Sequence, residues 1–268
     1  MALDSPGPSG ALAGLVLTVG GLSLVPLVIF LARHIFPGRN VFFARWGFSH
    51  VLVVVGAALV FGAAAGAVAG AREWPLPEVL VALLGSCAAF SGAALLIATL
   101  AIRLDPAGWR SLGLWRGRSA RAVAVGLVSY VLLYPAQLGL LLLWPWTFEA
   151  LGGEFEMQEV ALGIAALDGR HVWLALCLAS VIIPFLEELI FRAFLQPLLV
   201  QNLGNAAGIV LTSILFAILH GPAAFLPIFA LSLLLGAIML RTQRLLAVWV
   251  VHALHNALSF SFLFAVKP

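Results

Sequence analysis

The chain has 268 residues, of which 63% are hydrophobic and 9% are charged, and its formal net charge is +3. Soluble globular domains carry about a quarter of their residues as charged side chains, so the composition excludes an ordinary soluble protein and predicts an all-α, polytopic membrane protein. The basic residues are spread over several connections between apolar stretches. Such a distribution is typical of topology signals and excludes a single basic face for nucleic acid.

About 20 mostly apolar residues are needed for a helix to cross a bilayer, and about eight stretches approach this length. The first lacks the basic segment that precedes the apolar core of a signal peptide, so we expect it to be retained. The sixth and seventh are short and meet at Gly221-Pro222, so a re-entrant pair is an alternative there. The predicted helices are 11–33, 48–71, 78–102, 121–144, 171–198, 206–221, 223–240 and 245–266.

We expect one integral membrane domain over residues 1–268. Residues 171–266 hold the candidate catalytic helices, whereas residues 1–145 contribute N-terminal helices of unassigned role. Arginines concentrate in the connections after the first, third and seventh predicted helices. By the positive-inside rule these connections face the cytoplasm and both termini face away from it. We therefore expect a multi-pass protein of the cell (inner) membrane, with the bilayer as its surroundings.

The connection 145–170 is acidic and lies on the side opposite the arginine-rich connections. A solvated acidic loop with an interfacial helix is the ordinary interpretation of such a charge run. A surface that contacts a basic substrate segment is the alternative. Its acidic residues are Glu149, Glu154, Glu156, Glu159 and Asp168.

One stretch, from Pro184 to Arg192, places charged groups inside an apolar helix. Ionisable side chains at this depth cost about 2.5 to 3.5 kcal/mol each on insertion scales, so they indicate a functional site. Glu188 and Arg192 are four residues apart and share a helix face, whereas Glu187 is turned about 100° away and is left for chemistry. Pro184 has no N–H for the carbonyl of Ser180, so we expect the helix to bend or open just before the glutamates.

Three more polar side chains lie in the late helices. His220 is near one end of the sixth helix, and His252 and Asn256 are four residues apart on one face of the eighth. Buried polar groups need partners, so we expect these residues to meet Glu187 in an intramembrane cavity. The nearby hydroxyls are interpreted as helix-packing or backbone-bonding groups; they are Ser180, Thr212 and Ser213.

These residue types suit the attack of water on an amide. That reaction needs a base, hydrogen-bond donors for the tetrahedral oxyanion, and an acid for the leaving amine. Glu187 with His220 can activate water, while His252 and Asn256 can donate to the oxyanion. The scheme requires no serine or cysteine nucleophile.

Three motifs follow one another on successive helices of the second half of the chain: Glu187-Glu188-x-x-x-Arg192, Phe216-x-x-x-His220 and His252-x-x-x-Asn256. Together they resemble the motifs of the CAAX protease and bacteriocin-processing (CPBP, or Abi) family of intramembrane endopeptidases. The resemblance implies a glutamate-type protease that cleaves a membrane protein or a lipidated peptide and uses no metal cofactor. It implies catalytic roles for Glu187, His220, His252 and Asn256 and supporting roles for Glu188 and Arg192.

The resemblance covers roughly the last 100 residues, and two positions there depart from the usual pattern. Ala193 stands where many members have glycine, and His255 is an extra histidine that competes for the third-motif role. Neither departure changes the expected assignment.

Other hypotheses stay open at this point. Two histidines and a carboxylate also form a legitimate zinc site, although HExxH is absent from the chain. A proton-sharing pair of Glu187 and Glu188 is disfavoured because adjacent helical residues point to different faces. A transporter or a non-catalytic immunity or scaffold protein would also keep polar groups at mid-membrane. A transporter would usually show related halves, whereas here the polar groups lie in the second half only.

Overall fold

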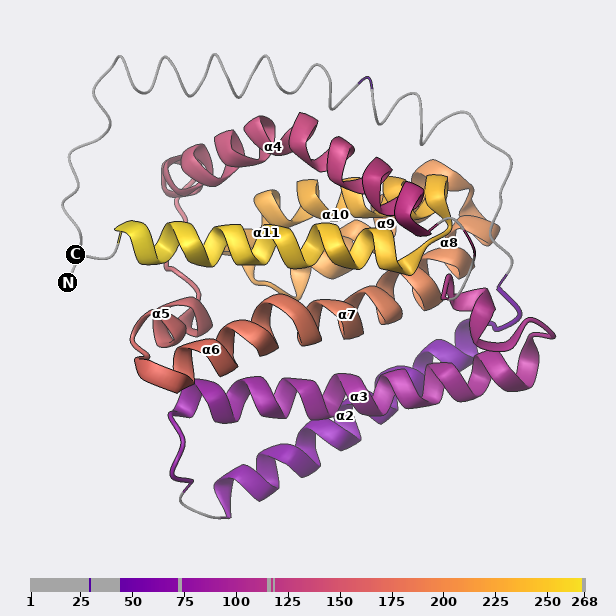
Figure 1. Ribbon diagram of the computed structural model, residues 1–268, viewed down its shortest axis with the longest axis horizontal. Coiled ribbons are helices and arrows are strands. Elements are labelled where there is room, and N and C mark those ends of the chain that lie inside the picture. Colours follow the sequence, from indigo (N-terminus) through magenta and orange to yellow (C-terminus); the bar gives the residue numbers. More distant parts are fainter. Residues whose placement is uncertain (1–28, 30–43, 72–73, 115–116, 118, 267–268) are drawn as a thin grey trace.

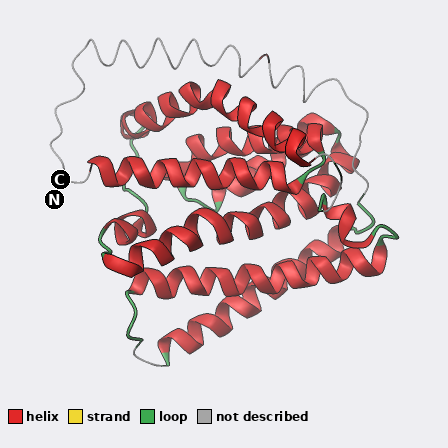
Figure 2. Ribbon diagram, in the orientation of Figure 1, coloured by secondary structure: helices red, strands yellow, loops and turns green. Residues whose placement is uncertain are grey.

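The regular structure is entirely helical in the part of the chain that the computed structural model describes, namely residues 29, 44–71, 74–114, 117 and 119–266 (Figure 2). The predicted all-α membrane architecture is thereby confirmed. The first predicted helix, 11–33, lies outside these residues apart from Ile29.

Six of the described helices are long and apolar enough to cross a membrane, so the predicted count of eight is approximate. One more apolar helix, α9, has only 14 residues. At 1.5 Å per residue α9 covers about 21 Å, which is less than the roughly 30 Å of the hydrocarbon core. The six are α2 (Phe48–Gly70), α3 (Glu78–Leu104), α4 (Ser119–Ala150), the composite helix Gly169–Leu203, Pro222–Thr242 with α10 (Phe225–Thr242), and α11 (Leu245–Val266); α9 is Asn205–Ile218.

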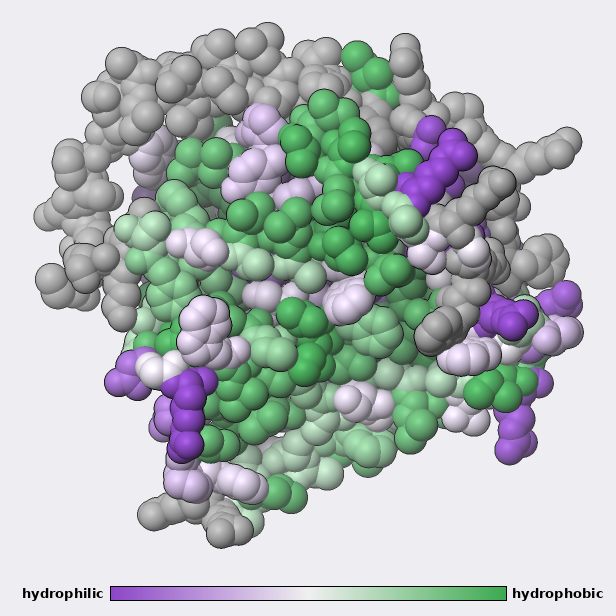
Figure 3. All heavy atoms as spheres, viewed as in Figure 1, coloured by the Kyte–Doolittle hydropathy of each residue, from purple (hydrophilic) through white to green (hydrophobic). Residues whose placement is uncertain are grey.

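The helices run roughly parallel or antiparallel to one another across the molecule (Figure 1). α2 pairs with α3, and α3 packs against the composite helix, which in turn packs against α11. α4 and α10 cover the other side of α11, and α9 forms a hairpin with α10. On the visible face, hydrophilic residues gather at the two ends of the helices and hydrophobic residues cover the surface between them (Figure 3).

The composite helix is not the single regular helix that was predicted over 171–198. Two stretches are π-helical, with wider turns, and the glutamates lie between them. Its segments are α6 (Gly169–Cys177), π-helical η2 (Leu178–Ile182), α7 (Ile183–Glu188), π-helical η3 (Leu189–Leu195) and α8 (Gln196–Leu203).

Pro184 lies just after the first π-helical stretch, as its missing N–H led us to expect. The carbonyl that lacks a bond from Pro184 is not the predicted one, however. Ile183 N–H bonds to Leu178 O, five residues back, so in this register Pro184 would have paired with Ala179 and not with Ser180. The wider turn therefore moves the site of the missing bond by one residue.

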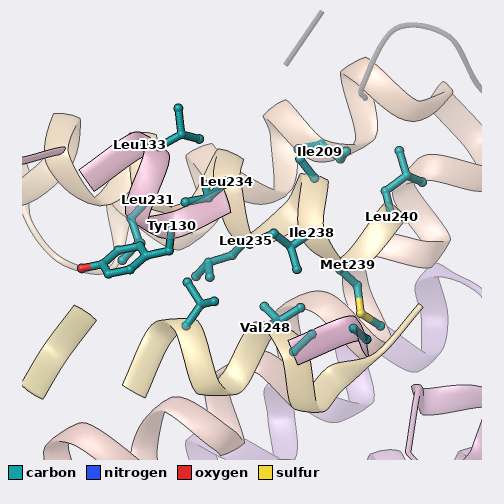
Figure 4. Packing of buried hydrophobic residues seen from close by; sticks show 14 of the residues in the cluster. Tyr130, Leu133, Ile209, Leu231, Leu234, Leu235, Ile238, Met239, Leu240 and Val248 are labelled. Carbon is teal, nitrogen blue, oxygen red and sulfur yellow. The ribbon is translucent and has the colours of Figure 1, made fainter. Parts of the chain in front are cut away.

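The central core lies between α4, α9, α10 and α11 (Figure 4). Leu235, Ile238 and Met239 of α10 are buried there together with Val248 of α11. This packing fixes α11, which carries two of the candidate site residues.

The acidic connection is partly helical. α4 continues to Ala150, beyond its predicted end at 144, and a short helix, α5 (Glu159–Ala165), follows. Ile164 of α5 is fully buried in a cluster with Leu80 of α3 and Ala175 of α6. The connection is therefore anchored to the end of the bundle.

Candidate active site

Glu188 and Arg192 form the buried ion pair that their spacing predicts. Arg192 Nη1 lies 3.2 Å from Glu188 Oε1, and both side chains have no exposed surface. The guanidinium also stands over the ring of Phe216, 4.5 Å from its centroid. An unpaired charge in such surroundings would be costly, so the pairing holds both groups in place.

Ser232 of α10 is a partner of Arg192 that the sequence did not single out. Arg192 Nη2 donates to Ser232 Oγ at 2.7 Å and lies 3.4 Å from Ser232 O. Ser232 is fully buried. A lone serine in an apolar helix resembles the packing serines elsewhere in the chain, so only the tertiary contact distinguishes it.

His252 of α11 lies between the two glutamates. Its Nδ1 is 2.7 Å from Glu188 Oε1, and its Nε2 is 3.9 Å from Glu187 Oε2. An ionised carboxylate can only accept hydrogen bonds, so Nδ1 carries the hydrogen and donates to Glu188. The opposite ring nitrogen then faces Glu187, whose side chain keeps 13% of its surface exposed.

His220 follows α9, and the ring of Phe216 lies between it and His252. The Phe216 ring lies 4.6 Å from His220 and 5.8 Å from His252, centroid to centroid. His220 Nδ1 is 2.8 Å from Phe216 O, so Nδ1 donates and Nε2 keeps its lone pair. Gln158, from the acidic connection, donates to the carbonyl of His220 at 3.1 Å.

Asn256 lies on α11 one turn beyond His252, but part of its amide is already engaged. Its Nδ2 donates to Ala179 O at 3.0 Å. An amide nitrogen has two hydrogens, so one donor remains for another acceptor. Only the tertiary structure could reveal this second use of the side chain.

The extra histidine, His255, points to a different part of the bundle. Its Nδ1 is 3.0 Å from the hydroxyl of Tyr130 on α4, and both residues are buried. Thr212 bonds to the carbonyl of Gly208, as expected of a helix-packing hydroxyl. Among the residues that the structure describes, no three His, Cys, Asp or Glu side chains are grouped so that they could hold a metal ion.

Residues 169–258 match the model of the Rce1-like family, described as type II CAAX prenyl endopeptidase Rce1-like. This segment is about a third of the chain and contains every candidate site residue. The predicted relationship to CAAX proteases is confirmed over the Rce1-like segment, and the match supports a CAAX-type protease, a hydrolase.

No curated protein matches the chain, and no solved structure matches it. The family match and the apolar helices together make the protein an integral, multi-pass membrane protein that contains an Rce1-like segment.

Proposed function

We propose that the protein is an intramembrane glutamate-type endopeptidase of the cell membrane that hydrolyses a peptide bond of a membrane protein or a lipidated peptide. The observation that carries the proposal is the placement of His252 between Glu187 and Glu188, with Glu188 tied to buried Arg192. A water about 2.8 Å from both Glu187 Oε2 and His252 Nε2 is compatible with their 3.9 Å separation.

In this mechanism Glu187 takes a proton from the attacking water, while neutral His220 accepts a hydrogen bond at Nε2. Doubly protonated His252 donates through Nδ1 to Glu188, and its Nε2 donates to the oxyanion and then gives its proton to the leaving amine as the C–N bond breaks. The proton held by Glu187 then passes to Nε2 of His252, so both side chains return to their starting state. The free N–H of Asn256 is the second oxyanion donor. Glu188 and Arg192 orient His252 and are not consumed.

The proposed mechanism uses no metal. Glu187 Oε2 and His252 Nε2 converge on one point, but Glu188 lies at the opposite ring nitrogen. In the described part of the chain no third His, Cys, Asp or Glu side chain joins them. A catalytic zinc takes three protein ligands, so this arrangement favours the metal-free mechanism.

The test is Glu187→Gln, which keeps the shape of the side chain and removes its basicity. Purified parent and variant are assayed on a prenylated peptide with a C-terminal CAAX sequence, and the membrane proteomes of cells carrying either protein are compared. We expect turnover to fall by about a hundredfold or more. Glu156→Gln, the same change in the acidic connection, is the control and should leave turnover unchanged.

Turnover by Glu187→Gln at the parental rate would contradict glutamate as the base. The same preparations are assayed after chelation and analysed for metal. Zinc at one ion per chain, with activity lost on stripping and restored by zinc, would instead favour a zinc protease.

A further inference from the structure

One face of α11 contacts the opened helix at three points. Trp249, His252 and Asn256 occupy positions i, i+3 and i+7 of α11, so they share a face. Trp249 Nε1 donates to Val181 O at 2.8 Å, and Asn256 Nδ2 donates to Ala179 O at 3.0 Å. His252, between them in sequence, holds Glu188.

Trp249 and Asn256 both donate to carbonyls of the π-helical stretch η2, just before Pro184. Pro184 has no N–H, and in the π-helical register the bond it cannot make is the one to Ala179 O. Asn256 supplies a donor to that oxygen. Its amide therefore takes the place of the missing backbone N–H.

Trp249 donates to a second main-chain carbonyl of the same turn, that of Val181. The Val181 side chain lies on the surface of the bundle and is 40% exposed, where hydrocarbon offers no hydrogen bond to a main-chain carbonyl. The indole N–H supplies one. The indole ring also packs edge to face on Phe185, at 5.5 Å and 78°, so Trp249 contacts the chain on both sides of Pro184.

We propose that Trp249 is a positioning residue that holds the proline-opened turn against α11 and thereby sets the distance between Glu187 and His252. α7, Ile183–Glu188, follows directly, so a shift of Val181 is transmitted along about 1.7 helical turns to Glu187. Because Trp249 and His252 lie on the same rigid helix, the turn and the imidazole are held by one element. The kinetic consequence rests on the proposed function.

The test compares two variants that separate the hydrogen bond from the ring. Trp249→Phe keeps the aromatic ring and loses the donor, whereas Trp249→Gln loses the ring and keeps an N–H that can donate to Val181 O. We expect kcat of Trp249→Phe to fall about fivefold, the value of one hydrogen bond, with KM unchanged. Trp249→Gln should retain the higher kcat of the two.

Trp173→Phe on α6 is the matched control, because Trp173 is 73% exposed on the bundle surface. Hydrogen exchange of the peptide covering 179–188 is measured for all three variants. We expect faster exchange in Trp249→Phe than in Trp173→Phe, whether or not the protein cleaves the chosen peptide. This structural measurement is independent of the proposed function.

Parental kcat and parental exchange in Trp249→Phe would overturn the proposal, as would a kcat of Trp249→Phe above that of Trp249→Gln. If Trp249→Phe does not fold, Trp249→Gln decides alone: exchange as slow as in the parent supports the donor role, and faster exchange overturns it. Glu187→Gln is run in the same assay, so that residual cleavage there identifies a failure of the proposed function instead.

Discussion

At the scale of single residues, the Arg192 guanidinium is tightly enclosed. It has no exposed surface and is held by Glu188, by Ser232 and by the Phe216 ring. Glu188 also accepts from His252, so the charge of Arg192 is linked through one carboxylate to the site histidine. Loss of the guanidinium would leave Glu188 buried without its cation.

We therefore expect Arg192→Ala to lower the free energy of unfolding by about 3 to 5 kcal/mol, as for other broken buried pairs. The measurement is thermal or denaturant unfolding in detergent. Arg103→Ala, at an exposed arginine near the end of α3, is the control and should change stability by less than about 1 kcal/mol. Equal stability of parent and Arg192→Ala would contradict the buried pair.

At the scale of elements, the close approach of α8 and α9 holds the last part of the composite helix. A Cβ at Gly208 of α9 would lie 2.5 Å from Val200 N and 2.6 Å from its Cα. The main chains therefore touch there, and only glycine allows this distance. The contact between α8 and α9 in turn positions α9 so that Phe216 reaches both Arg192 and His252.

We expect Gly208→Ala to destabilise the protein by about 3 kcal/mol, the upper part of the range for overpacking, because backbone atoms cannot move aside as a side chain can. The melting temperature in detergent is the readout. Gly66→Ala in α2 is the matched control: its Cβ would meet nothing within 4 Å. That change should be neutral or stabilising by up to about 1 kcal/mol, and a similar loss in both variants would refute the close approach.

At the scale of the whole molecule, the question is from which side water and substrate reach the site. His220 lies in the turn between α9 and α10, on the α5 side of the site, because its carbonyl accepts from Gln158, the residue just before α5. The end of α3, the start of α4 and the α10–α11 connection, where most of the described arginines of the arginine-rich connections lie, are at the other end (Figure 1), which the positive-inside rule places in the cytoplasm. Leu219 is 71% exposed beside His220, whereas Leu189 and Val248 are buried.

We expect a cysteine at Leu219, in a background without Cys87 and Cys177, to react with a membrane-impermeant thiol reagent added on the side opposite the arginine-rich connections. Cysteines at Leu189 and Val248 should react slowly or not at all, because both positions are packed in the core. Labelling yield by mass shift measures this. Reaction of the Leu219 cysteine only from the cytoplasmic side would show that the His220 end faces inward.

The sequence alone determined the helical class, the positions of most long helices and the pairing of Glu188 with Arg192. These follow from local properties: apolar length, the 3.6-residue period, and the cost of an unpaired charge in hydrocarbon. The three motifs likewise indicated the relationship to CAAX proteases that residues 169–258 show, because residue identity and spacing along the chain are enough to define the motifs. Every residue that the motifs selected for the site lies on α7, η3 or α11 or in the turn after α9.

Only the tertiary structure decided which partners these residues have. Ser232, Trp249 and Gln158 carry no local signal, since each is a single polar or amphipathic residue whose importance depends on what another helix brings near it. The rotation of α11 decided that His252 meets the glutamates while His255 meets Tyr130. Which side chains meet in this way depends on packing between helices distant in the sequence, and the periodicity of a single helix does not predict it.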